Sequence, residues 1–192
     1  MKRAAALLFL VFTAGLTTSA SVRYEAVARF SARSVEMTSP ARLSFRHVDI
    51  SISQWSTDQD HRLLARTFME KGPVGFVDVL CGYPAVGTIA VAGGGTFTIR
   101  YAWQVPDRDG GQRIYLASDE PIALVSFSEF RRFGEMERMY FVELRLDRYG
   151  NGEGKLSDNI RLSVDQSRNA IELRDYDRRP LHLVMVHDET VE

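Results

Sequence analysis

The sequence of 192 residues contains very little cysteine, because Cys81 is its one thiol. A single cysteine cannot form a disulfide within the chain, so the apolar core and hydrogen bonds must hold the fold together. The residues around this cysteine, Val77, Val79 and Leu80, are apolar. We therefore predict a buried, unreactive thiol in preference to a reactive or intermolecular one.

Long apolar runs are also missing, apart from the run at 4–16. Lys2 and Arg3 precede this run, and small residues up to Ala20 follow it. This order is typical of a secretory signal, and it predicts cleavage near Ala20 and export to a periplasm or the cell exterior. The run is shorter than the roughly 20 residues that span a bilayer, so we expect no stable membrane anchor. An uncleaved N-terminal anchor is the alternative.

The chain has no large charge of either sign. Without the predicted signal at 1–20 it carries 22 basic and 25 acidic side chains. Such a balance produces no long-range field, so nucleic acid and an anionic membrane surface are disfavoured as partners. The length suits one β-rich domain at 41–192, preceded by an N-terminal arm or edge strand at 21–40.

Catalytic signatures are missing as well. The sequence contains no Gly-x-Ser-x-Gly, no His-Glu-x-x-His and no phosphate-binding loop. Asp58 and His61 share one helix face and are weak candidates for a metal site, which would need further ligands. Acidic residues that stabilise a helix N-terminus are the simpler interpretation. The acidic turns at 107–111 and 147–153 resemble parts of calcium loops but are better explained as hairpin turns. We expect no cofactor.

A long bent strand is predicted at 41–54. Apolar residues alternate with polar ones from Val48 to Ile52, which is the period of a half-buried strand. Leu43 and Phe45 alternate too, but in the opposite phase. A shift of one residue is what a β-bulge produces, so a bulge is predicted near His47.

Two short helices are predicted next, at about 57–71 and 73–82. Ser56 and Gln59 have the spacing of a capping box. Gly72 and the proline after it favour a helix end followed by a second helix start. The side chains expected on the buried stripes are Leu63, Leu64, Phe68, Met69, Val74, Val77, Leu80 and Cys81.

The rest of the chain has the pattern of short strands joined by tight turns. Strands are predicted at 87–91, 97–104, 112–117, 122–127, 139–147, 160–164, 170–176 and 181–187, with the glycines at 150–154 as a break. Such strands pair with their sequence neighbours, which predicts a mainly β fold of about 8–10 strands with a minor helical part. The antiparallel meander can form either a barrel or a sandwich. The order of strand, two helices and meander is similar to the topology of intracellular fatty-acid-binding proteins.

The stretch Trp55-Ser56-Thr57-Asp58 resembles a segment that recurs in a group of exported bacterial proteins. The stretches 111–122, 143–156 and 171–176 resemble further strands and turns of that group, so the likeness spans roughly 48–187. The resemblance implies an exported β-rich domain and supplies no catalytic residue.

These observations favour a non-catalytic exported domain that binds a small lipophilic ligand or a protein partner. The residues predicted to form the binding surface are Trp55, Tyr101, Trp103 and Tyr115. Ordinary packing of aromatic residues in a β core is the competing interpretation. One alternative is a hydrolase or divalent-metal enzyme with dispersed residues, for instance His47 and Asp119. Another is a structural, envelope-associated role.

Overall fold

A computed structural model describes residues 25–39, 42–107, 109–120, 122, 139–157, 160–165, 170–176 and 180–191. The predicted signal at 1–20 and most of the predicted strand at 122–127 lie outside these residues. Within these residues lie eleven strands and the helical segment α1, which breaks at Gly72: β1 (Ala28–Ser39), β2 (Arg42–Ile52), α1 (Asp58–Cys81), β3 (Gly87–Val91), β4 (Gly95–Ile99), β5 (Tyr101–Pro106), β6 (Gln112–Ser118), β7 (Tyr140–Leu146), β8 (Asn151–Ser157), β9 (Ile160–Asp165), β10 (Ala170–Tyr176) and β11 (Leu181–Asp188). The predicted fold class is confirmed.

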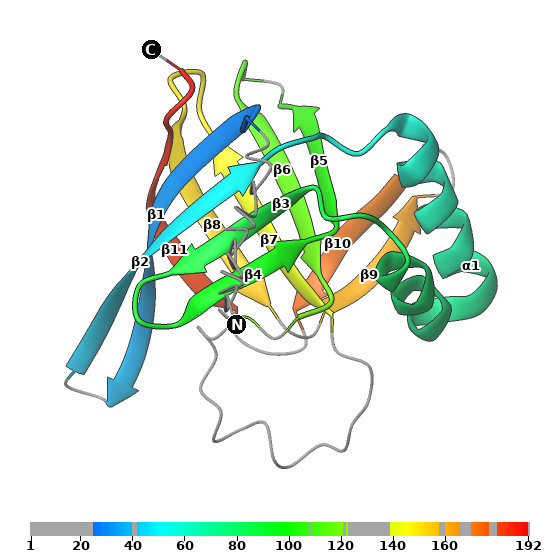
Figure 1. The fold of residues 1–192 in the computed structure, drawn as a ribbon, viewed down its shortest axis with the longest axis horizontal. Helices are drawn as coiled ribbons and strands as arrows, with labels where there is room; N and C mark the ends of the chain where they lie inside the picture. The colour runs from blue at the N-terminus through cyan, green and yellow to red at the C-terminus, as the bar shows by residue number, and fades with distance from the viewer. Residues whose placement is uncertain are drawn as a thin grey trace, which may run out of the picture.

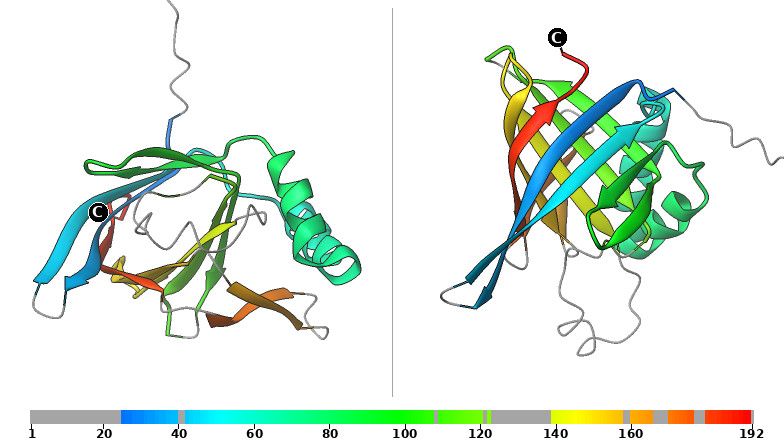
Figure 2. Two further views of the ribbon diagram at one scale, coloured as in Figure 1. Left: turned by 90° about the horizontal axis from the view of Figure 1, so that it is seen from below. Right: turned by 60° about the vertical axis from the view of Figure 1, so that its left-hand side comes forward.

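Nine strands form one antiparallel sheet in the order β4-β3-β2-β1-β11-β8-β7-β6-β5. The sheet curls into a nearly closed barrel, with α1 packed against its outside (Figures 1 and 2). β9 and β10 pair only with each other among the described strands, and β10 lies next to α1. The meander therefore leaves the barrel for one hairpin, and β8 pairs directly with β11.

The barrel closes at Arg100, where the two edge strands of the sheet are adjacent in sequence. A single strand was predicted at 97–104, and this prediction is wrong because the chain turns between β4 and β5. The Arg100 N–H donates to the carbonyl of Ala117 on β6, and the Arg100 guanidinium forms an ion pair with Asp119 at 2.7 Å. The same guanidinium donates to the backbone carbonyl of Tyr83. These contacts fix the corner that brings the two edges together.

Ser56 helps to close the barrel and is not the helix cap. Its N–H donates to the carbonyl of Ala102 on β5 at 2.8 Å, and its hydroxyl accepts the Ala102 N–H at 3.0 Å. The capping box begins one residue later than predicted, with Thr57 as N-cap and Asp60 as its reciprocal partner. The helix start was thus predicted correctly and the cap residue wrongly.

β1 is a central strand of the barrel. It pairs with β2 on one side and β11 on the other, so the prediction of an arm or edge strand at 21–40 is wrong for the described part. Small and polar residues dominate its sequence, which hides the strand pattern. Nonetheless Ala28, Phe30 and Ala32 face the interior and are buried. The domain therefore includes this strand.

β2 runs without a bulge at His47, contrary to prediction. Its pairing with β1 is continuous from Leu43 to Ile52. Val48, Ile50 and Ile52 point into the core, whereas Leu43 and Phe45 lie on the outer face with 58% and 55% of their surface exposed. The change of phase in the sequence thus marks a change of environment, because the outer part of β2 projects beyond the barrel (Figure 1).

α1 has a break at Gly72, as the sequence predicts. Gly72 has φ 69° and ψ −166°, which is outside the helical region and favours glycine. Leu64, Phe76 and Leu80 are buried against the barrel. The predicted stripes are wrong at Leu63, Met69, Val74 and Cys81, which are exposed because the helix packs on one side only. No helix in the described part of the chain is both long and apolar enough to span a membrane.

Gly152 and Gly154 lie inside β8, although the sequence predicts that they interrupt a strand. A Cβ at Gly152 would be 1.9 Å from the carbonyl oxygen of Arg145 on β7. A Cβ at Gly154 would be 2.7 Å from the Cδ2 of Leu144. Glycine is therefore required here for the close approach of neighbouring strands in the curved sheet.

Candidate functional site

Three of the four predicted surface aromatics lie close together on the outside of the barrel. Tyr101 and Trp103 are on β5, and Tyr115 is directly opposite Trp103 on β6. Alternation along β5 and β6 turns Ala102 and Ile114 inward and the three rings outward, toward α1. Tyr101 is buried, while Trp103 and Tyr115 are half-buried.

His61 joins these rings from the first turns of α1. Its ring stacks on Trp103, with centroids 4.7 Å apart and planes 8° apart. Its Nδ1 is 2.6 Å from the hydroxyl oxygen of Tyr101. We call the group formed by His61, Tyr101, Trp103 and Tyr115 the aromatic cluster. It links the helix to the barrel edge that Ser56 closes.

The environment of the aromatic cluster favours neutral groups. Desolvation lowers the pKa of His61 below its ordinary value, although Asp58 partly opposes this effect. Burial raises the pKa of Tyr101 far above that of a free phenol, and Asp60 raises it further. The Tyr101 hydroxyl therefore stays protonated and can donate a hydrogen bond to His61 Nδ1; in that arrangement the neutral imidazole carries its own proton on Nε2.

Charged residues continue the surface from Tyr115 across the sheet. Burial, followed by the charge of Glu143, raises the pKa of Tyr115. Glu143 is the cross-strand partner of Tyr115 on β7, and Lys155 follows on β8. Arg113 donates from Nε to Asp107 at 2.8 Å. Aromatic, cationic and anionic groups thus share one outer face.

The arrangement is suited to binding. Half-buried aromatic rings present apolar surface, and the flanking arginine, glutamate and lysine add charges of both signs to the same face. Tyr101 is held as a neutral phenol, which disfavours a nucleophilic role for it.

No family model, curated protein or solved structure matches the chain. The resemblance of 48–187 to exported bacterial proteins stays a prediction.

The remaining predicted site residues do not belong to the aromatic cluster. Trp55 packs against the interior core of the barrel instead. Asp58 lies in the first turn of α1, where its charge favours the helix N-terminus. Among the described residues, no three His, Cys, Asp or Glu side chains gather so that they could hold a metal ion.

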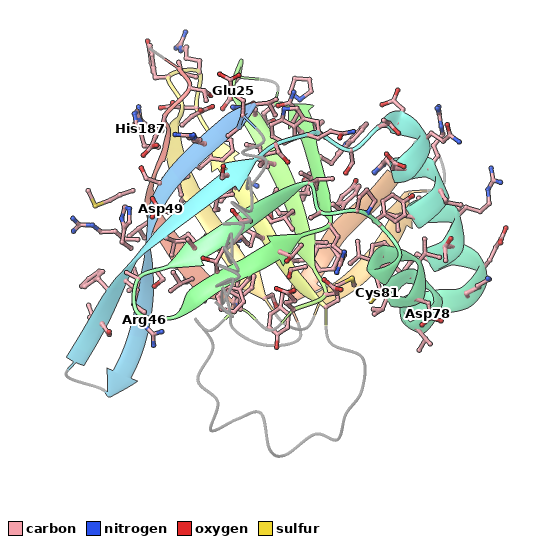
Figure 3. All side chains as sticks on the ribbon, in the orientation of Figure 1. Glu25, Arg46, Asp49, Asp78, Cys81 and His187 are labelled. Carbon is pink, nitrogen blue, oxygen red and sulfur yellow. The ribbon has the colours of Figure 1, made fainter. Side chains whose placement is uncertain are left out.

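Cys81 is exposed, so the prediction of a buried thiol is wrong. It lies near Asp78 in the last turn of α1 (Figure 3), next to Leu80, which is buried against the barrel. Desolvation and then the Asp119 carboxylate raise its pKa, so the thiol stays protonated at neutral pH.

The dispersed pair of His47 and Asp119 forms other contacts. His47 Nε2 lies 2.9 Å from Asp49 on the same strand, and Asp119 pairs with Arg100 at the barrel corner.

The acidic turns stabilise themselves, as the hairpin interpretation predicts. Asp147 accepts the N–H groups of Tyr149 and Asn151, and Asp109 accepts that of Gly111. A cavity of about 320 Å³ lies between these turns and is lined by Gln104, Val105, Pro106, Gly110, Gly111, Gln112, Asp147, Arg148, Gly150 and Val191. None of the four residues of the aromatic cluster lines it, and the turn amides already engage the Asp147 carboxylate.

His61 is expected to make folding stability depend on pH. Its folded pKa lies below the ordinary value of 6.5. The unfolded chain therefore binds a proton first as pH falls, and stability should decrease from about pH 6.5 down to the folded pKa. Partial exposure of the imidazole keeps the slope well below the ceiling of about 1.4 kcal/mol per pH unit.

Urea unfolding between pH 7.5 and 5 measures this effect. His61→Gln should flatten the pH dependence relative to the unsubstituted protein. His182→Gln, on an exposed part of β11, serves as control and should leave the slope unchanged. Parallel curves for the protein and the His61 variant would contradict the assignment.

Proposed function

We propose that the protein is an exported, non-catalytic domain that binds another protein through the aromatic cluster and the charged residues beside it, Arg113, Glu143 and Lys155. The observation that carries the proposal is that Trp103 and Tyr115 form a cross-strand pair of half-buried rings on the outer face of the barrel. Export rests on the N-terminal sequence pattern.

The packing of the barrel interior favours an external site over an enclosed one. The inward side chains of the described strands form one apolar cluster, which includes large residues such as Phe30, Ile50, Ile114 and Tyr140. A small lipophilic ligand held inside a barrel needs an unfilled apolar cavity. The cavity of about 320 Å³ lies at a rim of turns and has glutamine and charged residues in its wall.

The composition of the outer face also favours a protein partner. Tryptophan, tyrosine and arginine are enriched among the residues that dominate protein–protein binding energy. Trp103, Tyr115 and Arg113 are neighbours on β5 and β6, and His61 holds one face of the Trp103 ring. A ring that is already held loses less conformational freedom on binding.

Site-specific photo-crosslinking can find the partner. A photoreactive phenylalanine analogue in place of Tyr115 should crosslink the partner in cells that export the protein. The same analogue at Tyr149, an exposed tyrosine of the β7–β8 turn, is the matched control and should not. The captured protein is then purified and titrated against the variants.

Tyr115→Ala is expected to weaken binding of the purified partner by at least about tenfold, as for an interface residue worth 1.4 kcal/mol or more. Tyr149→Ala should leave the affinity unchanged. Equal effects of the two variants would contradict the proposed surface. A co-purified lipid in native mass spectra, with no crosslink at residue 115, would favour the lipophilic-ligand alternative.

A further inference from the structure

The outer half of β2 is an open sheet edge. β2 pairs with β3 only from Val48 to Ile52, whereas its pairing with β1 continues to Arg42. The turn after β3 reaches one residue further, where the Ala92 N–H donates to the carbonyl of His47. Beyond His47, the described residues supply no strand on this side of β2.

The direction of the free backbone groups follows from that last hydrogen bond. In an antiparallel sheet the N–H and C=O of a residue point to the same side, and the side alternates along the strand. His47 points toward β3, so Phe45 and Leu43 also direct their N–H and C=O groups to the open side. These two residues present a template for another strand.

The side chains at this edge define what such a strand would need. Leu43 and Phe45 are on the outer face and more than half exposed, and Val35 lies opposite Phe45 on β1. Ser44 and Arg46 are on the other face. Figure 3 shows Arg46 on the part of the β1–β2 hairpin that projects beyond the barrel. An added strand would therefore meet apolar groups on one face and a polar, basic pair on the other.

The positive charge of the outer part of the β1–β2 hairpin disfavours a second copy of the same chain as the partner of this edge. Residues 33–47 contain three arginines and one glutamate. A second copy would bring the same excess of positive charge to the edge, and like charges on neighbouring strands are destabilising.

We propose that the free edge of β2 binds an extended segment of a different protein, in which apolar and acidic residues alternate. The apolar residues pack on Leu43 and Phe45, the acidic residues face Arg46, and backbone hydrogen bonds extend the sheet. This surface is separate from the aromatic cluster, so either proposal can fail without the other.

The test uses the chain from residue 21 onward and a capped heptapeptide of alternating valine and glutamate. Hydrogen exchange followed by NMR should show the amides of Leu43 and Phe45 slowed at least tenfold at saturating peptide. The Leu43→Thr/Phe45→Thr double variant keeps strand propensity but loses the apolar contacts, so its affinity should be about tenfold weaker. Val105→Thr, at another exposed strand position, is the matched control and should bind normally.

Two altered peptides separate the forces involved. Replacing glutamate with lysine should abolish binding through repulsion by the arginines. Methylating the peptide nitrogens that face β2 should abolish it by removing the hydrogen bonds.

Several results would overturn the proposal. One is equal binding of the lysine peptide. Another is protection of the Leu43 and Phe45 amides before any peptide is added, which would mean that the chain itself covers the edge. Concentration-dependent dimerisation through these amides would assign the edge to a second copy. Binding to anionic phospholipid vesicles without any response to the peptides would assign it to a membrane surface.

Discussion

Phe30→Ala is expected to lower the free energy of unfolding by about 3–5 kcal/mol, the usual cost of deleting a buried phenylalanine ring. Phe30 has only 2% of its surface exposed and points from β1 into the barrel core. The substitution would leave a cavity in the middle of the sheet, because β1 has a paired strand on each side. Chemical denaturation at constant pH measures the change.

Phe45→Ala is the matched control, since the same ring is removed from the adjoining strand. Phe45 is 55% exposed, so the variant should change stability by less than about 0.5 kcal/mol. The pair tests whether β1 is central and whether β2 changes environment along its length. If 21–40 were an unpaired arm, Phe30→Ala would cost as little as Phe45→Ala.

Gly152→Val is expected to destabilise the protein by about 3 kcal/mol or more through overpacking against β7. Valine is a favourable strand residue, so strand propensity alone predicts stabilisation. The Cβ would instead lie 1.9 Å from the carbonyl oxygen of Arg145, and backbone has no room to yield without loss of the β7–β8 ladder. Thermal and urea unfolding both report the loss.

Glu153→Val provides the control at the next position of the same strand. Glu153 is exposed on the outer face, so the same new side chain should change stability by no more than about 0.5 kcal/mol. If both valine variants shifted stability equally, the close approach of β8 to β7 would not be the reason for the glycine.

The aromatic cluster could be predicted only in part. Aromatic residues at alternating positions identify Tyr101, Trp103 and Tyr115 as members of one face, because strand periodicity is local. The contact of His61 with Tyr101 joins residues forty positions apart, and no sequence spacing indicates it. Arg113 was missed for the same reason, since its role depends on the cross-strand register. Trp55 was included because of its type, although it packs on a different core.

The sequence alone determined the local features: strands that alternate, a helix broken at Gly72, tight acidic turns, and hence an antiparallel β fold with a helical insertion. Each of these features depends on residues that are near one another in the sequence.

Tertiary structure decided how the strands meet. It alone made 97–104 two strands at opposite edges of the sheet, kept Gly152 and Gly154 inside a strand, and left Leu43 and Phe45 outside the core. The physical reason is that barrel closure depends on contacts between residues far apart in sequence, such as Ser56 with Ala102. Local periodicity specifies that a strand has two faces, but only the closed sheet specifies which face is buried and which edge stays open.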